Sequence, residues 1–393
     1  MRVLHITTDD IGGAGLCCLR IHQSLLTNGI ESKVVTIRNT RHATEEYSYG
    51  YWKDIFSKGF SKGLRQIGLK ITDRSKTGAL AKKYNTAYSL PVSPIDLTEC
   101  EWVEWADIIH LHWVNNYLDY PSFFRKVKKP IVWTLHDENL FYGIAHHHRS
   151  ILPNHHLEIK YRQVKYDAVR KAENLTVVFL SEMMSRNFGN EKIIEGRHKC
   201  VINNSVNTSV FQPSDTDMMR EKYGIDKQRM TVLFIAVDIC DPNKGLDVLS
   251  EVLLDVNSDA QILAIGNNPS KKSWKNVISV GLVRDQRKMA ELISCADFFA
   301  MPSYQEAFSQ SPIEAMACGL PVVAFPVSGT SELINGQNGI VCDDFSPNSL
   351  RKGIEMLMER KYNASEIRQD IVARYSPEVV AQKYMEVYEN VKL

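Results

Sequence analysis

The residues best suited to chemistry stand close together in the last quarter of the chain. Residues 302–323 read PSYQEAFSQSPIEAMACGLPVV, with seven residues between Glu306 and Glu314. A strand is expected to end before this segment, and a helix to begin between Ser309 and Pro312. Free N–H groups at a helix start suit a pyrophosphate, and a carboxylate can accept hydrogen bonds from both vicinal hydroxyls of a ribose. The segment therefore predicts a nucleotide site in which Glu314, in the first helical turn, binds the ribose.

The start of this helix carries three further candidate residues. Phe308, Ser309 and Gln310 stand where the helix is expected to begin, so we expect them to line the pyrophosphate site. Glu314 has a structural alternative, because Ser311-x-x-Glu314 fits a capping box. Taken alone, that short pattern favours the cap.

Short apolar stretches alternate with helical patterns along the chain. Parallel strands buried on both faces have this β-branched, apolar composition, and the alternation predicts two doubly wound α/β sheets. The expected strands of the first half are 2–7, 32–37, 108–112, 131–135 and 175–179. Those of the second half are 231–237, 260–265, 277–280, 297–301 and 321–325, with helices at 286–294 and 312–318. Ligands of such sheets bind at the carboxyl ends of the strands.

A glycine-rich turn follows the first strand. Gly12 and Gly13 would let the backbone approach a phosphate or a sugar closely, although a plain turn explains them equally well. A helix from about residue 16 to residue 28 should follow, closed by Gly29.

Composition limits the classes of protein. The 393 residues are 44% hydrophobic and 24% charged with a net charge of +1, which is typical of a soluble enzyme and gives no general attraction to nucleic acid. The eight cysteines form no C-x-x-C pair. The N-terminus reads as a strand, and no apolar run reaches the ~18 residues of a membrane-spanning helix. These features predict a cytoplasmic protein.

The 302–323 string resembles the donor-site signature of family-4 retaining glycosyltransferases, in which two glutamates with seven residues between them precede an Ala-Met-Ala-x-Gly-x-Pro-Val-Val run. Other segments are similar to that family: the Gly12–Ala14 loop, the Lys244-Gly245 pair and a GxxExxxGxxG pattern over 329–339. The strings HLHW at 110–113 and WTLHD at 133–137 resemble a polysaccharide-synthesis subgroup.

The resemblance implies a GT-B fold, in which two Rossmann-like doubly wound domains face each other across a cleft. The N-terminal, acceptor-side domain is expected at 1–205, together with a C-terminal helix at 377–393 that crosses back to it. The nucleotide-sugar-binding domain is expected at 206–376. The boundary between the domains is expected where the polar stretch 203–217 interrupts the strand–helix pattern.

The resemblance also implies roles for particular residues. Lys244 is expected to neutralise the donor diphosphate, whose charge grows as the glycosidic bond breaks. Glu306 is expected to contact the transferred sugar or to stabilise positive charge at its anomeric carbon. His136 is expected to bind hydroxyls of the donor sugar, with a buried structural histidine as the alternative.

Several positions depart from the family pattern or mimic a metal site. Many relatives carry an arginine where this chain has Ile239, so a base such as Arg284 is a candidate substitute. Asp215-x-Asp217 mimics a metal-binding pair, but we interpret it as a solvated linker. The histidine run 146–148 could bind metal adventitiously, and an acceptor-facing loop is the preferred interpretation.

The predicted function is retaining, metal-independent transfer of a hexosyl group from a nucleoside-diphosphate sugar, with no other cofactor. The expected acceptor is a bacterial polysaccharide or a lipid-linked saccharide. Three alternatives stay open: a nucleotide-sugar epimerase of the same fold, a nicotinamide-dependent oxidoreductase, and a catalytically inactive sugar-nucleotide-binding protein. The oxidoreductase fingerprint G-x-G-x-x-G breaks at Cys18.

One basic segment stands apart from these motifs. Residues 53–83 carry nine Lys or Arg and two Asp, and apolar residues recur there at helical spacing. An ordinary surface helix is one interpretation. A peripheral contact with an anionic membrane or a lipid-linked acceptor is the other.

Overall fold

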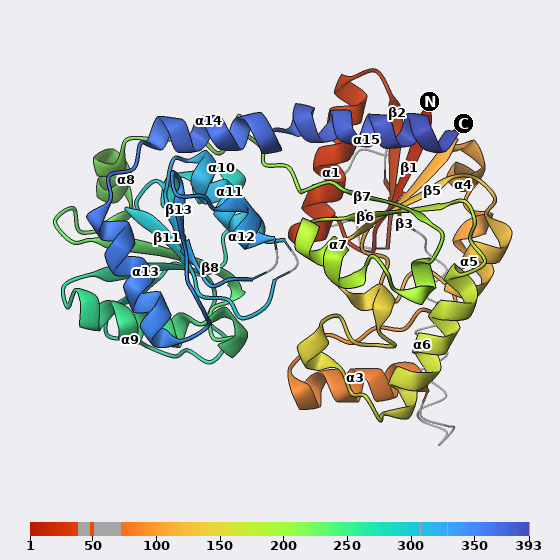
Figure 1. Cartoon of the computed structure of the whole chain (residues 1–393), viewed down its shortest axis with the longest axis horizontal. Coiled ribbons are helices and arrows are strands. Elements are labelled where there is room, and N and C mark those ends of the chain that lie inside the picture. Colours follow the sequence, from red (N-terminus) through yellow and green to blue (C-terminus); the bar gives the residue numbers. More distant parts are fainter. Residues whose placement is uncertain (38–47, 51–71, 307, 328, 393) are drawn as a thin grey trace. The chain divides into compact units, whose positions relative to one another are not determined.

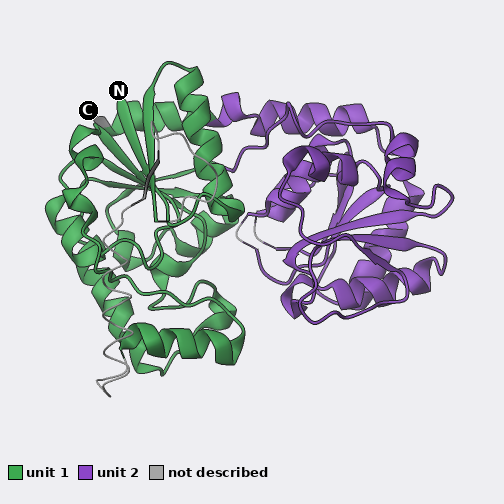
Figure 2. Ribbon diagram, turned by 180° about the vertical axis from the view of Figure 1, so that it is seen from behind, with its two compact units in different colours: residues 1–202, 381–393 green, residues 203–380 purple. Residues whose placement is uncertain are grey.

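A computed structural model describes residues 1–37, 48–50, 72–306, 308–327 and 329–392 of the chain (Figure 1). The chain divides into two compact units (Figure 2). Unit 1 contains residues 1–202 and 381–393, and unit 2 contains residues 203–380. Each unit is built around one parallel sheet with its own core.

The sheet of unit 1 has seven strands in the order β3-β2-β1-β4-β5-β6-β7. Neighbouring strands run parallel, as buried apolar strands joined by helices require. Because the order reverses between β1 and β4, these two strands form the switch point at which open α/β sheets bind ligands. The strands are β1 (Arg2–Ile6), β2 (Glu31–Thr36), β3 (Ser48–Gly50), β4 (Ile108–Leu111), β5 (Ile131–Leu135), β6 (Leu175–Phe179) and β7 (His198–Val201).

The helices of unit 1 follow its strands and cover the sheet. The described α-helices are α1 (Gly12–Thr27), α3 (Asp73–Tyr84), α4 (Glu101–Trp105), α5 (Tyr120–Lys126), α6 (His156–Val169) and α7 (Glu182–Phe188). Short 3-10 turns lie at η1 (Leu97–Glu99), η2 (Asn139–Phe141), η3 (His148–Ser150) and η4 (Lys192–Ile194).

The last helix, α15 (Pro377–Lys392), joins unit 1 from Ala381 onward. Two of its tyrosines are fully buried there. Tyr384 Oη lies 2.9 Å from Thr134 Oγ1, and Tyr388 Oη lies 2.7 Å from His110 Nδ1. These buried hydrogen bonds, with the apolar contacts around them, attach the end of the chain to this sheet.

Unit 2 repeats the plan with six parallel strands in the order β10-β9-β8-β11-β12-β13. Alternate residues of β8, such as Val232 and Phe234, share an apolar core with α9 and α13 on one face. The strands are β8 (Thr231–Asp238), β9 (Gln261–Asn267), β10 (Val277–Ser279), β11 (Phe298–Met301), β12 (Val322–Ala324) and β13 (Gly339–Val341). The helical elements are α8 (Thr216–Tyr223), η5 (Pro242–Lys244), α9 (Leu246–Val256), α10 (Gln286–Ile293), α11 (Gln310–Ala317), α12 (Thr330–Leu333), α13 (Pro347–Glu359) and α14 (Ala364–Tyr375).

The ten strands predicted from the sequence are present, each within two residues of its expected ends. Three further strands, β3, β7 and β13, are edge strands of three or four residues that carry too weak a pattern for prediction. Within the described ranges, no helix is both long and apolar enough to cross a membrane. Most of the basic segment at 53–83 lies outside the described residues; its end forms α3.

Candidate functional site

Lys244 lies at the carboxyl edge of the unit 2 sheet, on the η5 turn that follows β8. Asp241 begins this turn, because its side chain accepts a hydrogen bond from the N–H of Asn243 at 2.9 Å. Gly245 then adopts φ +76°, a conformation that favours glycine, and a Cβ there would lie 2.3 Å from the carbonyl oxygen of Pro302. The turn is therefore held tightly against the segment that follows β11.

That second segment carries Glu306. The N–H of Tyr304 donates to the carbonyl oxygen of Asn243 at 2.9 Å, which ties the segment to η5. As a result Lys244 Nζ lies 2.6 Å from Glu306 Oε1. β8 and β11 are the neighbours at which the strand order of unit 2 reverses, so this pair occupies the switch point of the sheet.

The Lys244–Glu306 pair remains open to solvent, with side-chain accessibilities of 28% and 16%. An ion pair this exposed contributes little to stability, so its placement is better explained by binding. A diphosphate carries more negative charge than one carboxylate and would compete with Glu306 for the ammonium group. The carboxylate would then be free to contact another group, such as a sugar hydroxyl.

Helix α11 begins close to this pair in sequence, at Gln310, with Ser309 as its N-cap residue. The Ser309 side chain makes no capping hydrogen bond, so the first N–H groups of the helix are not satisfied by that hydroxyl. The ring of Phe308 is buried, 6.3 Å from the Tyr375 ring. Phe308 can therefore serve an anion only through its backbone, whereas Ser309 and Gln310 are half-buried.

Glu314 lies in the second turn of α11, and the expectation that it lies in the first turn is wrong. With Ser309 at the N-cap, the capping-box interpretation also fails, because that motif needs the glutamate three residues after the cap. Glu314 is 9% exposed. Burial, with the nearby charge of Glu314, raises the pKa of the Cys318 thiol to about 12. The carboxylate thus stands in a largely enclosed place beside the next turn of its helix.

Neighbouring positions that depart from the family pattern have structural roles of their own. Ile239 is 1% exposed and packs in the core of unit 2, so no cation replaces the arginine at this position. Arg284 is exposed. Asp215 caps α8 by accepting from the N–H of Met218 at 2.8 Å, so the residue interpreted as solvated linker also begins a helix.

The glycine loop of unit 1 forms the beginning of α1, which starts four residues earlier than expected. Gly12 adopts φ +73° and begins the helix, and a Cβ at Gly12 or Gly13 would meet no atom within 4 Å. The close approach belongs instead to Gly15, where a Cβ would lie 2.6 Å from the carbonyl oxygen of Asp9. Open space above Gly12 and Gly13 is compatible with a ligand there.

His136 follows β5, at the carboxyl edge of the unit 1 sheet. Its Nε2 lies 3.2 Å from His112 Nδ1, and His112 Nε2 lies 3.0 Å from His5 Nδ1. Burial lowers the pKa of His136 to about 4, which keeps the ring neutral near pH 7. His136 also helps to line a cavity of about 10 Å³, which is room for about one water molecule. The hydrogen bond to His112 agrees with a structural role for His136. Its half-buried position at the cavity agrees with a role in ligand binding.

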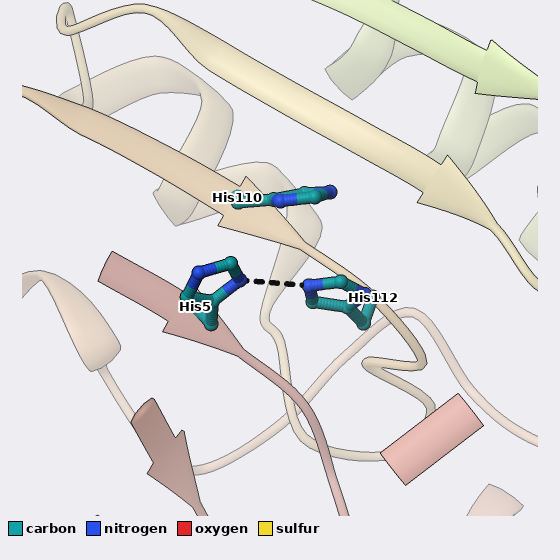
Figure 3. A group of neighbouring side chains, drawn as sticks. All are labelled: His5, His110 and His112. Atoms are coloured by element: carbon teal, nitrogen blue, oxygen red, sulfur yellow. Dashed lines mark hydrogen bonds between the residues drawn. The ribbon is translucent and has the colours of Figure 1, made fainter. Parts of the chain in front are cut away.

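Three histidines in this chain of contacts satisfy the distance condition for a metal site. The ligand atoms of His5, His110 and His112 lie within 4.8 Å of one another (Figure 3). However, both nitrogens of His110 already bond to hydroxyl groups, and both nitrogens of His112 bond to other histidines. Among these three rings, only His5 Nε2 is without a partner. A metal ion would have to break these bonds, so the group fits a hydrogen-bonded cluster better than a metal centre.

From the buried histidines we predict that acid lowers the stability of unit 1 and leaves the stability of unit 2 unchanged. All twelve histidines lie within residues 1–202. Burial lowers the pKa of His22 to about 4 and holds the pKa values of His5, His110 and His112 well below the usual range. The unfolded chain therefore binds protons from about pH 6.5 downward while the folded unit does not, so stability present above pH 6.5 is lost as the pH falls toward 4.

His22 alone should lower the free energy of unfolding by about 2 kcal/mol between about pH 7.5 and pH 5. Hydrogen exchange, corrected for the intrinsic pH dependence of the rates, should show loss of protection in unit 1 only. Unit 2 is the internal control, and equal loss of protection in both units would contradict the prediction.

Asp137 is the functional candidate that the sequence patterns missed. Its Oδ2 accepts hydrogen bonds from Trp113 Nε1 and His146 Nδ1, both at 2.7 Å, and its Oδ1 accepts from the N–H of Asn139 at 2.9 Å. Burial works against ionisation, but His146 and the N–H of Asn139 hold the pKa of this carboxyl well below its usual range. The WTLHD string contained Asp137, but the His146 partner lies on a later loop and only the fold shows the pair.

Comparison with known proteins gives these observations a family context. Residues 229–360 match the family model described as "Glycosyl transferases group 1". The chain is 28% identical over 208 residues to N,N'-diacetylbacillosaminyl-diphospho-undecaprenol alpha-1,3-N-acetylgalactosaminyltransferase of Campylobacter jejuni, covering 49% of this chain and 54% of that protein. It is 25% identical over 175 residues to D-inositol 3-phosphate glycosyltransferase of Segniliparus rotundus, covering 40% and 38%. The chain thus spans about half, or less, of the length of these curated relatives.

Solved structures show similarity over nearly the whole chain. Sucrose-phosphate synthase of Thermosynechococcus elongatus has a TM-score of 0.68 at 16% identity, covering 99% of this chain and 98% of that one. The Anabaena HepE protein, solved with UDP and glucose, has a TM-score of 0.65 at 18% identity, with 99% of each chain covered. At these identities the likeness establishes the fold. Residues 229–360 are therefore similar to the glycosyl transferases group 1 family, and the two Rossmann-like units have the GT-B fold.

Proposed function

We propose that this protein transfers a hexosyl group, with retention of configuration, from a nucleoside-diphosphate sugar to a saccharide or lipid-linked saccharide acceptor. The observation that carries the proposal is the Lys244–Glu306 pair at the switch point of unit 2, within the part of the chain that matches the glycosyl transferases group 1 model. A cation and a helix start suit the diphosphate, and two carboxylates are available for the sugar and the ribose.

Each residue has a proposed part. Lys244 and the first N–H groups of α11, around Ser309 and Gln310, hold the diphosphate. Glu314 binds the ribose hydroxyls. Glu306 contacts the transferred sugar after the diphosphate has replaced it as the partner of the Lys244 ammonium group. In unit 1, His136 binds sugar hydroxyls, and the backbone at Gly12 and Gly13 provides close approach to the ligand.

The mechanism proposed for the chemical step needs no pair of catalytic carboxylates. The acceptor hydroxyl attacks the anomeric carbon from the face that the diphosphate leaves, and the departing phosphate oxygen takes the hydroxyl proton. Lys244 stabilises the charge that develops on the leaving group, and Glu306 stabilises the positive charge at the sugar. The HepE and C. jejuni relatives support the substrate classes, because the former was solved with UDP and glucose and the latter is named for a diphospho-undecaprenol-linked acceptor.

A thermal-shift screen against nucleotide-sugars, followed by product analysis, tests the proposal. A donor at 100 times its dissociation constant should stabilise the protein by about 2.7 kcal/mol, and the best donor should be used in transfer assays. Stable transfer product with the starting anomeric configuration supports the proposal. Interconversion of donor sugars without any acceptor would point to an epimerase. Donor binding without any turnover would point to an inactive binding protein, an alternative that Ile239 in place of arginine keeps relevant.

We predict that catalysis needs no divalent metal. Lys244 and backbone N–H groups are proposed to carry the diphosphate charge, so removing free metal should leave the rate unchanged. Initial rates should be measured with and without excess EDTA, in protein dialysed against the chelator. Loss of activity with EDTA that manganese or magnesium restores would contradict the prediction.

Peripheral contact with an anionic membrane stays a prediction of the basic composition at 53–83. Cationic segments bind anionic lipid surfaces through long-range attraction that salt screens. The protein should co-sediment with vesicles containing phosphatidylglycerol and dissociate as salt is raised. Equal binding to neutral phosphatidylcholine vesicles, or no binding to either kind of vesicle, would contradict the membrane contact and favour an ordinary surface segment.

A further inference from the structure

His146, the first residue of the histidine run at 146–148, forms a close pair with a carboxylate. Its Nδ1 lies 2.7 Å from Asp137 Oδ2. An ionised carboxylate can only accept hydrogen bonds, so Nδ1 must carry the ring proton. In the neutral form of the ring, Nε2 then has a bare lone pair. Asp137 therefore sets both the orientation and the tautomer of His146.

The surroundings of Asp137 support this assignment. Trp113 Nε1 donates to the same carboxylate oxygen at 2.7 Å. Asn115 Nδ2 lies 3.4 Å from that oxygen and 3.3 Å from His146 Nδ1. Because an amide N–H and a ring N–H are both donors, the Asn115 amide points its proton to Asp137. Every neighbouring donor thus converges on the carboxylate and keeps it ionised.

Nε2 of His146 is available to a ligand. Within the described residues, this nitrogen makes no hydrogen bond. It is also not one of the fully buried side-chain nitrogens that lack a partner. By elimination, Nε2 belongs to the 5% of the side-chain surface that remains accessible. The ring centroid lies 5.8 Å from that of the half-buried Trp113. The residue thus presents one hydrogen-bond acceptor beside an aromatic ring.

The loop that carries this pair is braced from helix α6. Glu158, which is 4% exposed, accepts hydrogen bonds from the backbone N–H groups of Gly143, Ile144 and Ala145. A Cβ on Gly143 would lie 1.9 Å from the carbonyl oxygen of Glu158, so only glycine permits this approach.

The second brace is Lys165, which is fully buried. Its ammonium group donates to the Asn139 side chain at 2.8 Å and to the Tyr142 carbonyl at 2.9 Å. Burial lowers the pKa of Lys165 to about 7. Two buried ionisable side chains of one helix therefore hold residues 137–146 in place, which is the support that a precise binding geometry needs.

The ligand chemistry follows from this arrangement. An imidazole lone pair next to an ionised carboxylate favours an uncharged O–H donor and repels a phosphate. An aromatic ring at the same place suits the C–H face of a sugar. The pair also stands at the carboxyl ends of β4 and β5, where open α/β sheets bind ligands.

We propose that His146, positioned by Asp137, binds a hydroxyl group of the saccharide acceptor, with the hydroxyl donating its hydrogen bond to Nε2. This assignment rests on the proposed transferase function and adds a residue that recognises the acceptor. Asp137 acts through His146 as a positioning residue.

Steady-state kinetics with varied acceptor tests the proposal. His146→Asn should raise the acceptor KM by about 2- to 12-fold, the factor that loss of one neutral hydrogen bond gives. The donor dissociation constant and slow donor hydrolysis without acceptor should not change. His148→Asn is the matched control, because His148 is an exposed member of the same run, and it should behave as wild type. An unchanged acceptor KM in a folded, active His146→Asn protein overturns the role of His146 and leaves the transferase function intact. No transfer by the wild type to any acceptor refutes both.

The tautomer provides a readout that does not depend on activity. Nitrogen-15 NMR of the full chain should show that the neutral His146 ring carries its proton on Nδ1 and none on Nε2. Asp137→Asn should shift the population toward the Nε2–H tautomer, because an amide can donate to Nδ1, and should raise the acceptor KM as His146→Asn does. Melting temperatures check that the variants fold. A wild-type ring protonated at Nε2 overturns the proposal whatever the kinetics show.

Discussion

Replacing Lys244 by alanine should weaken the binding of nucleoside diphosphates by about 10- to 150-fold. The ammonium group is the cation that the structure places at the switch point of unit 2, 2.6 Å from Glu306. Removing one charge-assisted hydrogen bond costs about 1.5–3 kcal/mol, and each 1.4 kcal/mol is a factor of ten in affinity. The variant also leaves the negative charge of Glu306 without its partner, which further opposes an anionic ligand. Isothermal titration calorimetry with UDP and other nucleoside diphosphates measures the change.

The control for this variant is Lys222→Ala. Lys222 also forms a lysine–glutamate pair in unit 2, with Glu291 at 2.8 Å, but its side chain is 51% accessible and lies on α8. Loss of that pair should leave the affinity for nucleoside diphosphates unchanged. This result would show that the position of Lys244 matters, and not only the loss of one positive charge from unit 2. A wild-type dissociation constant for Lys244→Ala would show that another group holds the diphosphate.

Replacing Glu306 by glutamine should lower kcat by about 10²- to 10³-fold with little change in the donor KM. Positive charge at the anomeric carbon develops only as the bond to the diphosphate breaks, so a carboxylate aimed at it acts mainly in the transition state. Glutamine keeps an oxygen of similar shape and removes the charge. Steady-state rates over a range of donor concentrations, with melting temperatures to check folding, measure the effect. Full activity of Glu306→Gln would restrict the site to nucleotide binding.

Glu314→Gln serves as the matched comparison, because it makes the same chemical change eight residues further along. Its proposed ribose contact is equally strong in the ground and transition states, so the variant should raise the donor KM more than it lowers kcat. Since Ser309 is the N-cap of α11, the capping role that would have predicted no kinetic effect is excluded. Equal kinetic profiles for the two variants would contradict the separate roles.

Local patterns were sufficient for most of the fold. The long central strands are apolar on both faces and stand between helical patterns, so their positions follow from periodicity. The edge strands β3, β7 and β13 could not be predicted, because three or four residues are too few to show a periodic pattern. The start of α1 was placed too late, because Gly12 and Gly13 have low helix propensity and yet form its first turn.

For the site, the sequence by itself determined which residue types stand near the ends of strands. The spacing of Glu306, Glu314 and the start of α11 lies within one segment, and a local pattern can specify such a spacing. Lys244 was identified by its Lys-Gly pair, but its contact with Glu306 depends on a glycine that lets two loops meet.

Only the tertiary structure decided which distant residues share a hydrogen bond. His5, His112 and His136 come from three strands that are adjacent only because the sheet order places β1 beside β4 and β4 beside β5. Asp137 and His146 meet because Glu158 and Lys165 of α6 hold the intervening loop. Such contacts depend on strand order and on buried charges, whereas sequence patterns report periodicity and local spacing, and this is the physical reason that they were seen only in the fold.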